Sequence, residues 1–323
     1  MTYDNTVPST KSGVHAAGLG KRYGDLWALK GLDLAVPAGT VLGLLGHNGA
    51  GKTTALRILT TLAAPTEGSA TVAGHDVVTA AGSVRSCIGV AGQAATVDGL
   101  LTTRANLEMV GRLYRMSRAD AKARAKELLE QLELTDVADK LVKTLSGGMK
   151  RRADLAASLV AKPPVLFLDE PTTGLDPHSR NQLWDVLRAH VRTGATLVLT
   201  TQYLEEADRL ADDIVVLDHG VVAAHGTPAV LKAQFGGERI VITLAAASEI
   251  PRASAALTSF LDGDIAEEPE ARRLIVPVRT GTRLVELMRA LDAAGLDAHD
   301  IQRREVTLDD VFLAITHKTK KAA

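Results

Sequence analysis

The chain has 323 residues, 46% of them hydrophobic and 23% charged, which is ordinary for a folded globular protein with one or two domains. A net charge of −1 gives it no general attraction to nucleic acid or to an anionic membrane. No run of about 18 apolar residues predicts a transmembrane helix, and the polar N-terminus does not resemble a signal peptide. The single cysteine, Cys87, excludes an intrachain disulfide.

Residues 1–13 are expected to form a flexible tail. Beyond it, short apolar runs without alternation predict strands that are buried on both faces of a parallel sheet. The clearest runs are Val41–Leu45, Pro164–Leu168, Thr196–Thr200 and Ile214–Leu217. Helical patterns lie between them, for example at Asn181–Val191 and Leu204–Leu210. This order predicts an α/β domain over residues 14–236.

Two further regions have a different pattern. Residues 100–160 are rich in helix-forming residues, most clearly Ala119–Leu132, and predict an α-helical subdomain inserted in the α/β domain. Residues 237–323 predict a small C-terminal α+β domain that resembles a ferredoxin-like βαββαβ unit. Its expected elements are strand 239–244, helix 251–261, a weak strand near 265, strand 273–278, helix 282–293, strand 298–305 and helix 307–317.

A glycine-rich segment follows the first predicted strand and opens a helix. It reads Gly46, His47, Asn48, Gly49, Ala50, Gly51, Lys52, Thr53 and Thr54. Glycines at this spacing let successive backbone N–H groups surround a phosphate chain, which also faces the positive end of the helix. Lys52 adds a charge at the β- and γ-phosphates, and the Thr53 hydroxyl can bind Mg²⁺. The segment therefore predicts a P-loop nucleotide site.

Two more motifs carry chemistry. Asp169 and Glu170 end a buried strand, where one carboxylate can hold Mg²⁺ and the next can accept a proton from water that attacks a phosphate. In isolation such a pair is more often a turn. Ser146, Gly147 and Gly148 open a helix and make a second anion site, although a simple N-cap is the alternative.

Together these segments resemble the nucleotide-binding domain of ABC transporters over residues 14–230. The resemblance implies ATP and Mg²⁺ as cofactors and ATP hydrolysis as the activity. Ser146–Gly148 corresponds to the signature sequence, Glu170 to the catalytic glutamate and Asp176 to the D-loop. Tyr23 lies where an aromatic side chain stacks on adenine. Gln93 matches the Q-loop glutamine, and it is assigned both to catalysis and, with Thr53 and Asp169, to Mg²⁺.

The resemblance also implies the partners. Two copies are expected to meet head to tail, so that each nucleotide lies between the phosphate loop of one copy and Ser146–Gly148 of the other. A separate membrane permease would hold the subunit at the cytoplasmic face of the membrane. The segment Ala94–Leu107, which follows Gln93, is the expected docking region. No nucleic-acid partner is expected.

One position departs from the family pattern. Gln202 stands where the family usually has a histidine that contacts the γ-phosphate. An amide can donate and accept hydrogen bonds but does not titrate near neutral pH. Gln202 is therefore expected to sense the phosphate without carrying a proton; the alternative is a polar surface residue. No two of the nine histidines have metal-ligand spacing, and His47 is expected to be a spacer in the loop.

Three features resemble the ATP-binding subunits of daunorubicin-resistance-type exporters. They are Leu145–Ala156, the segment around Gln202, and the tail Thr307–Leu313. This branch implies export of a hydrophobic drug or antibiotic. The tail could instead be an amphipathic helix that packs on its own domain. The rival function is a soluble ATPase of the same superfamily that acts on nucleic acid or ribosomes. A protein with a dead site would lack Glu170 or Lys52, and both are present.

Overall fold

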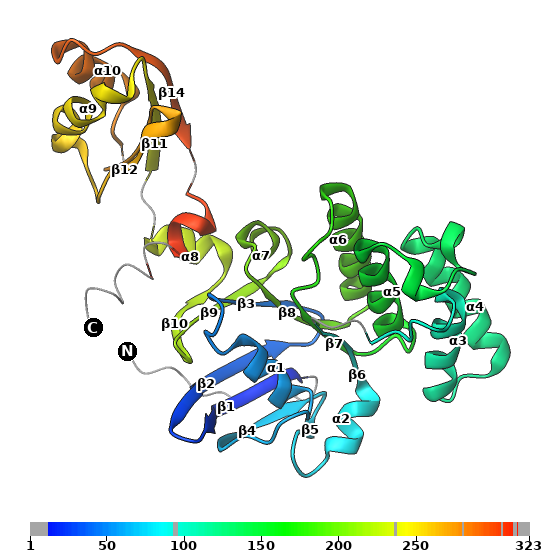
Figure 1. Ribbon diagram of the computed structural model, residues 1–323. Coiled ribbons are helices and arrows are strands. Elements are labelled where there is room, and N and C mark those ends of the chain that lie inside the picture. Colours follow the sequence, from blue (N-terminus) through cyan, green and yellow to red (C-terminus); the bar gives the residue numbers. More distant parts are fainter. Residues whose placement is uncertain are drawn as a thin grey trace. The chain divides into compact units, whose positions relative to one another are not determined.

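The computed structural model describes residues 12–92, 96–235, 238–279, 281–304, 306–312 and 315. The chain divides into two compact units (Figure 1). The first ends at Thr227 and the second begins at Pro228, so helix α8 (Pro228–Phe235) belongs to the second unit. The sequence pattern predicts this boundary at 236, at the far end of the same helix.

A six-stranded sheet forms the centre of the first unit, in the order β10-β9-β3-β8-β7-β6. Its strands are β3 (Val41–Leu45), β6 (Ile88–Ala91), β7 (Val165–Asp169), β8 (Thr196–Thr201), β9 (Asp213–Asp218) and β10 (Val221–Gly226). All neighbours pair in parallel except β9 and β10. The four predicted strands are confirmed as β3, β7, β8 and β9. Because parallel strands end at one edge of the sheet, the segments after β3, β7 and β8 lie together.

A second, antiparallel sheet was not predicted from the sequence. Its order is β2-β1-β4-β5. Its strands are β1 (Ser12–Tyr23), β2 (Leu26–Pro37), β4 (Glu67–Val72) and β5 (His75–Asp76). Along most of β2, buried residues alternate with exposed ones, as expected for a sheet with one solvated face.

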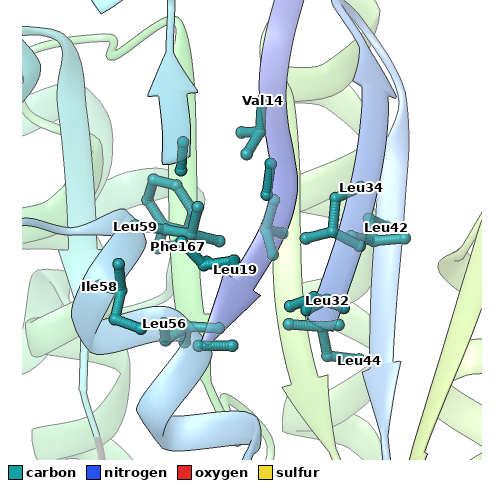
Figure 2. Packing of buried hydrophobic residues seen from close by; sticks show 14 of the residues in the cluster. Val14, Leu19, Leu32, Leu34, Leu42, Leu44, Leu56, Ile58, Leu59 and Phe167 are labelled. Atoms are coloured by element: carbon teal, nitrogen blue, oxygen red, sulfur yellow. The ribbon is translucent and has the colours of Figure 1, made fainter. Parts of the chain in front are cut away.

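The main core lies between the two sheets. Helix α1 (Lys52–Leu59) packs against β2 and β4 of one sheet and β7 of the other, and α2 (Ala81–Cys87) packs against β5 and β6. Figure 2 shows side chains of β1, β2, β3, β7 and α1 directed toward one another. Fully burying one of these Leu or Phe side chains stabilises the fold by roughly 1.5–3 kcal/mol. This core anchors both ends of the glycine-rich segment between β3 and α1.

The predicted helical subdomain is confirmed. Helices α3 (Thr103–Leu113), α4 (Arg118–Gln131) and α5 (Gly147–Leu159) lie between β6 and β7, with short 3-10 turns at Thr135–Val137 and Val142–Thr144. Each α-helix begins after a hydroxyl side chain that accepts a backbone N–H bond, which is the usual N-terminal cap. The caps are Thr102, Ser117 and Ser146.

Two more helices follow strands that end at the site. Helix α6 (Pro177–Arg192) starts earlier than predicted, because Asp176 caps it and Pro177 suits the first helical position. Helix α7 (Leu204–Leu210) has its predicted bounds.

The second unit contains a four-stranded antiparallel sheet in the order β12-β13-β11-β14. Its elements are β11 (Glu238–Leu244), α9 (Ile250–Leu257), β12 (Ala266–Glu268), β13 (Arg273–Val278), α10 (Leu284–Ala293) and β14 (Ala298–Arg304), with 3-10 turns at Ala247–Glu249, Thr258–Phe260 and Pro269–Ala271. This is the predicted βαββαβ order. Its core includes Ile240, Val276 and Leu287. No described helix of either unit is long and apolar enough to cross a membrane.

The tail motif is helical over residues 308–312, and most of its predicted continuation to 317 lies outside the described residues. Leu308 and Val311 are buried. Asp310 pairs with Arg239 at 3.6 Å and with Arg304 at 3.5 Å. The described part of the motif therefore packs on its own unit.

Candidate functional site

The segment Gly46–Gly51 connects the end of β3 to the start of α1. Gly46 has a φ of 151° and Gly51 a φ of 107°, which residues with side chains rarely adopt. A Cβ atom on Gly46 would lie 2.4 Å from the carbonyl oxygen of Leu217, and one on Gly51 would lie 2.6 Å from that of Ala28. Only glycine fits at either position. The loop thus leads directly into the helix end, whose first N–H groups can bind an anion.

The side chain of Lys52 folds back over this loop. Lys52 is only 5% exposed, and its Nζ donates to the carbonyl oxygens of Gly46 at 2.7 Å and His47 at 3.0 Å. Burial lowers the pKa of the Lys52 amine, whereas the nearby carboxylates of Glu170 and Asp169 raise it. The buried Lys52 ammonium is therefore bonded to the loop and is also attracted by the carboxylates of Asp169 and Glu170.

Thr53 and Asp169 are adjacent, as expected for residues assigned to one metal ion. The Thr53 hydroxyl donates to Oδ2 of Asp169 at 3.3 Å, and the Thr200 hydroxyl of β8 donates to Oδ1. Asp169 is buried at the end of β7. A hydroxyl and a carboxylate are hard oxygen ligands of the kind Mg²⁺ prefers, so this donor pair fits the ion. Gln93, the third residue assigned to it, lies outside the described residues.

Glu170 has an unusual backbone conformation. Its φ is 50°, in the left-handed region, which costs a non-glycine residue of the order of 1–3 kcal/mol. Its N–H donates to the Thr200 carbonyl at 3.0 Å, which helps to hold this conformation. Oε2 accepts bonds from the Thr173 hydroxyl at 3.3 Å and from the Gln202 amide at 3.4 Å. Gln202 therefore lies beside Glu170.

Arg151 belongs to the site, and the sequence reasoning missed it. It projects from α5 and donates to the backbone carbonyl oxygens of Gly92, Asp169, Glu170 and Pro171. Its side chain is 11% exposed. Burial lowers the pKa of its guanidinium below the ordinary value. Nearby carboxylates, that of Asp154 most strongly, oppose this shift only in part. The sequence shows that Arg151 follows the signature segment closely. It does not show that the Arg151 side chain points to Asp169 and Glu170, because this depends on how α5 packs.

These groups line one open cleft of about 680 Å³. The lining residues are Ala28, Asn48, Gly49, Ala50, Gly51, Lys52, Thr53, Thr54, Arg151, Glu170, Thr173 and Gln202. The structure thus unites most of the glycine-rich segment with the predicted Glu170 and Gln202. Ala28, Arg151 and Thr173 were not predicted.

Other predicted residues do not line this cleft. Tyr23 is 47% exposed at the end of β1, and the Lys21 ammonium lies 5.3 Å from its ring centre. Ser146 is exposed and accepts the Met149 N–H at 3.3 Å as the N-cap of α5; Gly147 and Gly148 follow it.

Asp176 is exposed and is the N-cap of α6. It accepts the Ser179 N–H at 2.9 Å, and this bond is the main cause of a lowered pKa for the Asp176 carboxyl. His47 lies in the loop, but its ring is directed to Asp218, with Nε2 3.0 Å from Oδ1. The cleft of one chain therefore contains only part of the predicted set.

Comparison with known proteins agrees with this geometry. The ABC transporter family model matches residues 29–173. The chain is 52% identical to a daunorubicin resistance ATP-binding protein of Streptomyces coeruleorubidus, over 95% of this chain and 96% of that one. It is 37% identical to a Nod factor export ATP-binding protein of Sinorhizobium fredii, over 98% of this chain and 90% of that one.

Among solved structures, a dimeric ATP-binding cassette in a post-hydrolysis state with ADP and Pi aligns with a TM-score of 0.62 and 27% identity. The match covers 66% of this chain and 98% of that one. The family resemblance read from the motifs is confirmed. The chain belongs to the ABC transporter family, as an ATP-hydrolysing, ATP-binding subunit of the daunorubicin-resistance type.

Proposed function

We propose that this subunit hydrolyses Mg²⁺-bound ATP to drive export of a hydrophobic drug or antibiotic through a separate membrane permease. The observation that carries the proposal is the single cleft that joins the glycine-rich loop, Lys52, Thr53, Glu170 and Gln202. The identity to a daunorubicin resistance protein supports the cargo class.

The loop residues would bind the phosphate chain. Backbone N–H groups of Asn48–Thr54 and the start of α1 provide donors and a favourable dipole, and Lys52 provides a point charge. When bound, Mg²⁺ neutralises charge on the phosphate oxygens. Thr53 and Asp169 would hold it, together with Gln93 by family resemblance. Tyr23 would stack on the adenine.

Glu170 would act as the general base. Its carboxylate accepts the proton of the water that attacks the γ-phosphate, because it lies in the same cleft as the phosphate loop. Gln202 and Thr173 both donate to Oε2 and so set the orientation of this carboxylate. An amide beside Glu170 can contact phosphate and water, but it does not compete with Glu170 for the proton.

A second copy of the chain would complete the site. Ser146, Gly147 and Asp176 are exposed and do not line the cleft of their own chain. They are therefore available to the nucleotide of another copy, and the related cassette solved with ADP and Pi is dimeric. ATP would hold two copies together and hydrolysis would release them, which gives a ligand-controlled two-state element.

The permease would receive this movement at the cytoplasmic face of the membrane. We assign the docking surface to the segment Ala94–Leu107, which follows Gln93 and includes the start of α3; residues 94 and 95 lie outside the described part of the chain. The rival function, a soluble ATPase acting on nucleic acid or ribosomes, has less support. The relatives at 52% and 37% identity are drug-resistance and export proteins.

The test is transport. Inverted membrane vesicles that contain the cognate permease and this subunit should take up daunorubicin in an ATP-dependent manner. Vesicles with the Lys52→Ala subunit should not, because the phosphate-binding charge is lost. Equal uptake with and without the subunit, or copurification with RNA in place of the permease, would reject the exporter function.

A further inference from the structure

Three potential metal ligands meet beside the phosphate loop, outside the ATP cleft. His47 comes from the loop, Asp218 ends β9, and His219 lies in the turn before β10. One ligand atom from each side chain lies within 4.8 Å of the others. The closest pairs are His47 Nε2 to Asp218 Oδ1, at 3.0 Å, and His219 Nε2 to the same oxygen, at 3.7 Å. His47 and His219 are far apart in the sequence, so no local spacing marks this group.

The hydrogen bonds of His47 leave its Nε2 facing the carboxylate of Asp218. Nδ1 lies 2.6 Å from the carbonyl oxygen of Asn48, which can only accept, so Nδ1 carries the ring hydrogen. A neutral imidazole has no second hydrogen, and its Nε2 then directs a lone pair at the carboxylate of Asp218. A metal ion between these two atoms converts this repulsion into two coordinate bonds.

Asp218 strengthens the case because it is a buried anion. Its side chain is 7% exposed, whereas the side chains of His47 and His219 are 37% and 78% exposed. Among the described residues, the side-chain partners of its carboxylate are these two imidazoles, with no Lys or Arg among them. A carboxylate removed from water requires a compensating charge.

The donor set fits a zinc-class ion. Two imidazoles and one carboxylate, with a fourth position open to water, are a common Zn²⁺ arrangement, whose bonds of about 2.0–2.2 Å place neighbouring ligand atoms about 3.3 Å apart. The observed 3.0 and 3.7 Å lie on either side of this value. The exposed His219 can adjust at little cost. The Nδ1 bond of His47 to a backbone carbonyl is the usual second interaction of a zinc-bound histidine.

We propose that His47, Asp218 and His219 bind one divalent transition-metal ion of the zinc class. The ion would link the turn after β9 to the phosphate loop, which is already joined to it by the bond from the Gly220 N–H to the Ala50 carbonyl at 3.0 Å. This links metal occupancy to the rigidity of the loop. The site is separate from the Mg²⁺ position at Thr53 and Asp169.

The test uses the full chain without a polyhistidine tag and without nucleotide. Titration calorimetry with ZnCl₂, in excess Mg²⁺, should show one Zn²⁺ bound per chain. His219→Ala should weaken binding at least about tenfold, in the range seen when groups around a metal site are removed. Because His219 is exposed, this variant is expected to fold. His299→Ala, which removes an exposed histidine of the second unit, should bind Zn²⁺ like the wild type.

Thermal unfolding provides an independent readout. Zn²⁺ should raise the Tm of the wild type and of His299→Ala, and it should raise that of His219→Ala much less, because a ligand stabilises the state that binds it. Absence of stoichiometric binding, or equal affinity in His219→Ala and wild type, would overturn the proposal. Neither result depends on ATP hydrolysis, so a failed ATPase assignment would leave this test intact.

Discussion

Arg151 connects the segments of the site through their backbone carbonyl groups. Its guanidinium contacts the residue after β6, the end of β7 and the turn that follows, and so determines how Asp169 and Glu170 are presented. A planar group with five donors can serve several acceptors at once, which an ammonium group cannot do in the same geometry. We therefore regard Arg151 as a positioning residue for Glu170.

Replacement of Arg151 by Lys should lower turnover more than ATP affinity. One buried carbonyl left without a donor costs about 1–3 kcal/mol, and a barrier increase of that size slows turnover by about 5- to 160-fold. Steady-state ATPase kinetics should show kcat falling with KM nearly unchanged. Arg152→Lys is the matched control, since Arg152 donates to Leu132 in the helical subdomain. Equal effects of both changes would assign Arg151 to general stability only.

Gln202 gives a second test at this scale. Gln202→Ala removes a donor to Glu170 Oε2 and should lower kcat by at least about tenfold, as the loss of one preorganised donor commonly does. Gln202→His should preserve contact and add a group that titrates near neutral pH. The pH–rate profile of this variant should therefore gain an inflection between pH 6 and 7 that the wild type lacks. Unchanged turnover in Gln202→Ala would remove the residue from the site.

At the level of elements, α7 is bonded to the segment after β7 through the buried carboxylate of Glu206. Glu206 is fully buried, and it accepts bonds from Thr172 at 3.2 Å and from Trp184 Nε1 at 3.2 Å. Burial raises the pKa of Glu206 above its ordinary value of 4.5, although these bonds partly oppose the shift. The helix is thus bonded to α6 and to the turn that follows β7.

This pKa shift predicts a pH dependence of stability. The folded state binds the Glu206 proton more tightly than the unfolded state, so its contribution is complete below pH 4.5 and is lost as pH rises through the raised pKa. The free energy of unfolding of the wild type, relative to Glu206→Gln, should therefore decrease as pH increases from 4.5. Urea unfolding at several pH values measures it. Glu205→Gln, at an exposed neighbour, should show no such trend.

The elements differ in how readily the sequence predicted them. Strands β3 and β7 are continuous apolar runs because both faces are buried, and their bounds were nearly correct. Strands β1 and β2 mix glycine and charged residues with apolar ones because one face is solvated, so no continuous run marks them. The loop and Glu170 were found from local motifs. Arg151 and the His47–Asp218 contact depend on packing between distant segments, which no local pattern records.

At the level of the whole molecule, the proposed ATPase mechanism requires two copies of the chain. Most of the glycine-rich loop, Thr53 and Glu170 line the cleft, and Thr53 is bonded to Asp169, whereas Ser146 and Asp176 are exposed and do not line it. Binding of ATP by two copies would bring these residues to the nucleotide. Hydrolysis would then reverse this association, a movement that a permease could use.

The most direct measurement compares Glu170→Gln with the wild type for ATP binding, hydrolysis and association. The variant should bind ATP with near-normal affinity and hydrolyse it at least about 100-fold more slowly, since a general base contributes about 10²–10⁴-fold. In size-exclusion chromatography with ATP it should elute as a dimer, while the wild type returns to monomer as ATP is consumed. Near-normal turnover in Glu170→Gln, or a monomer that persists with ATP bound, would contradict the account.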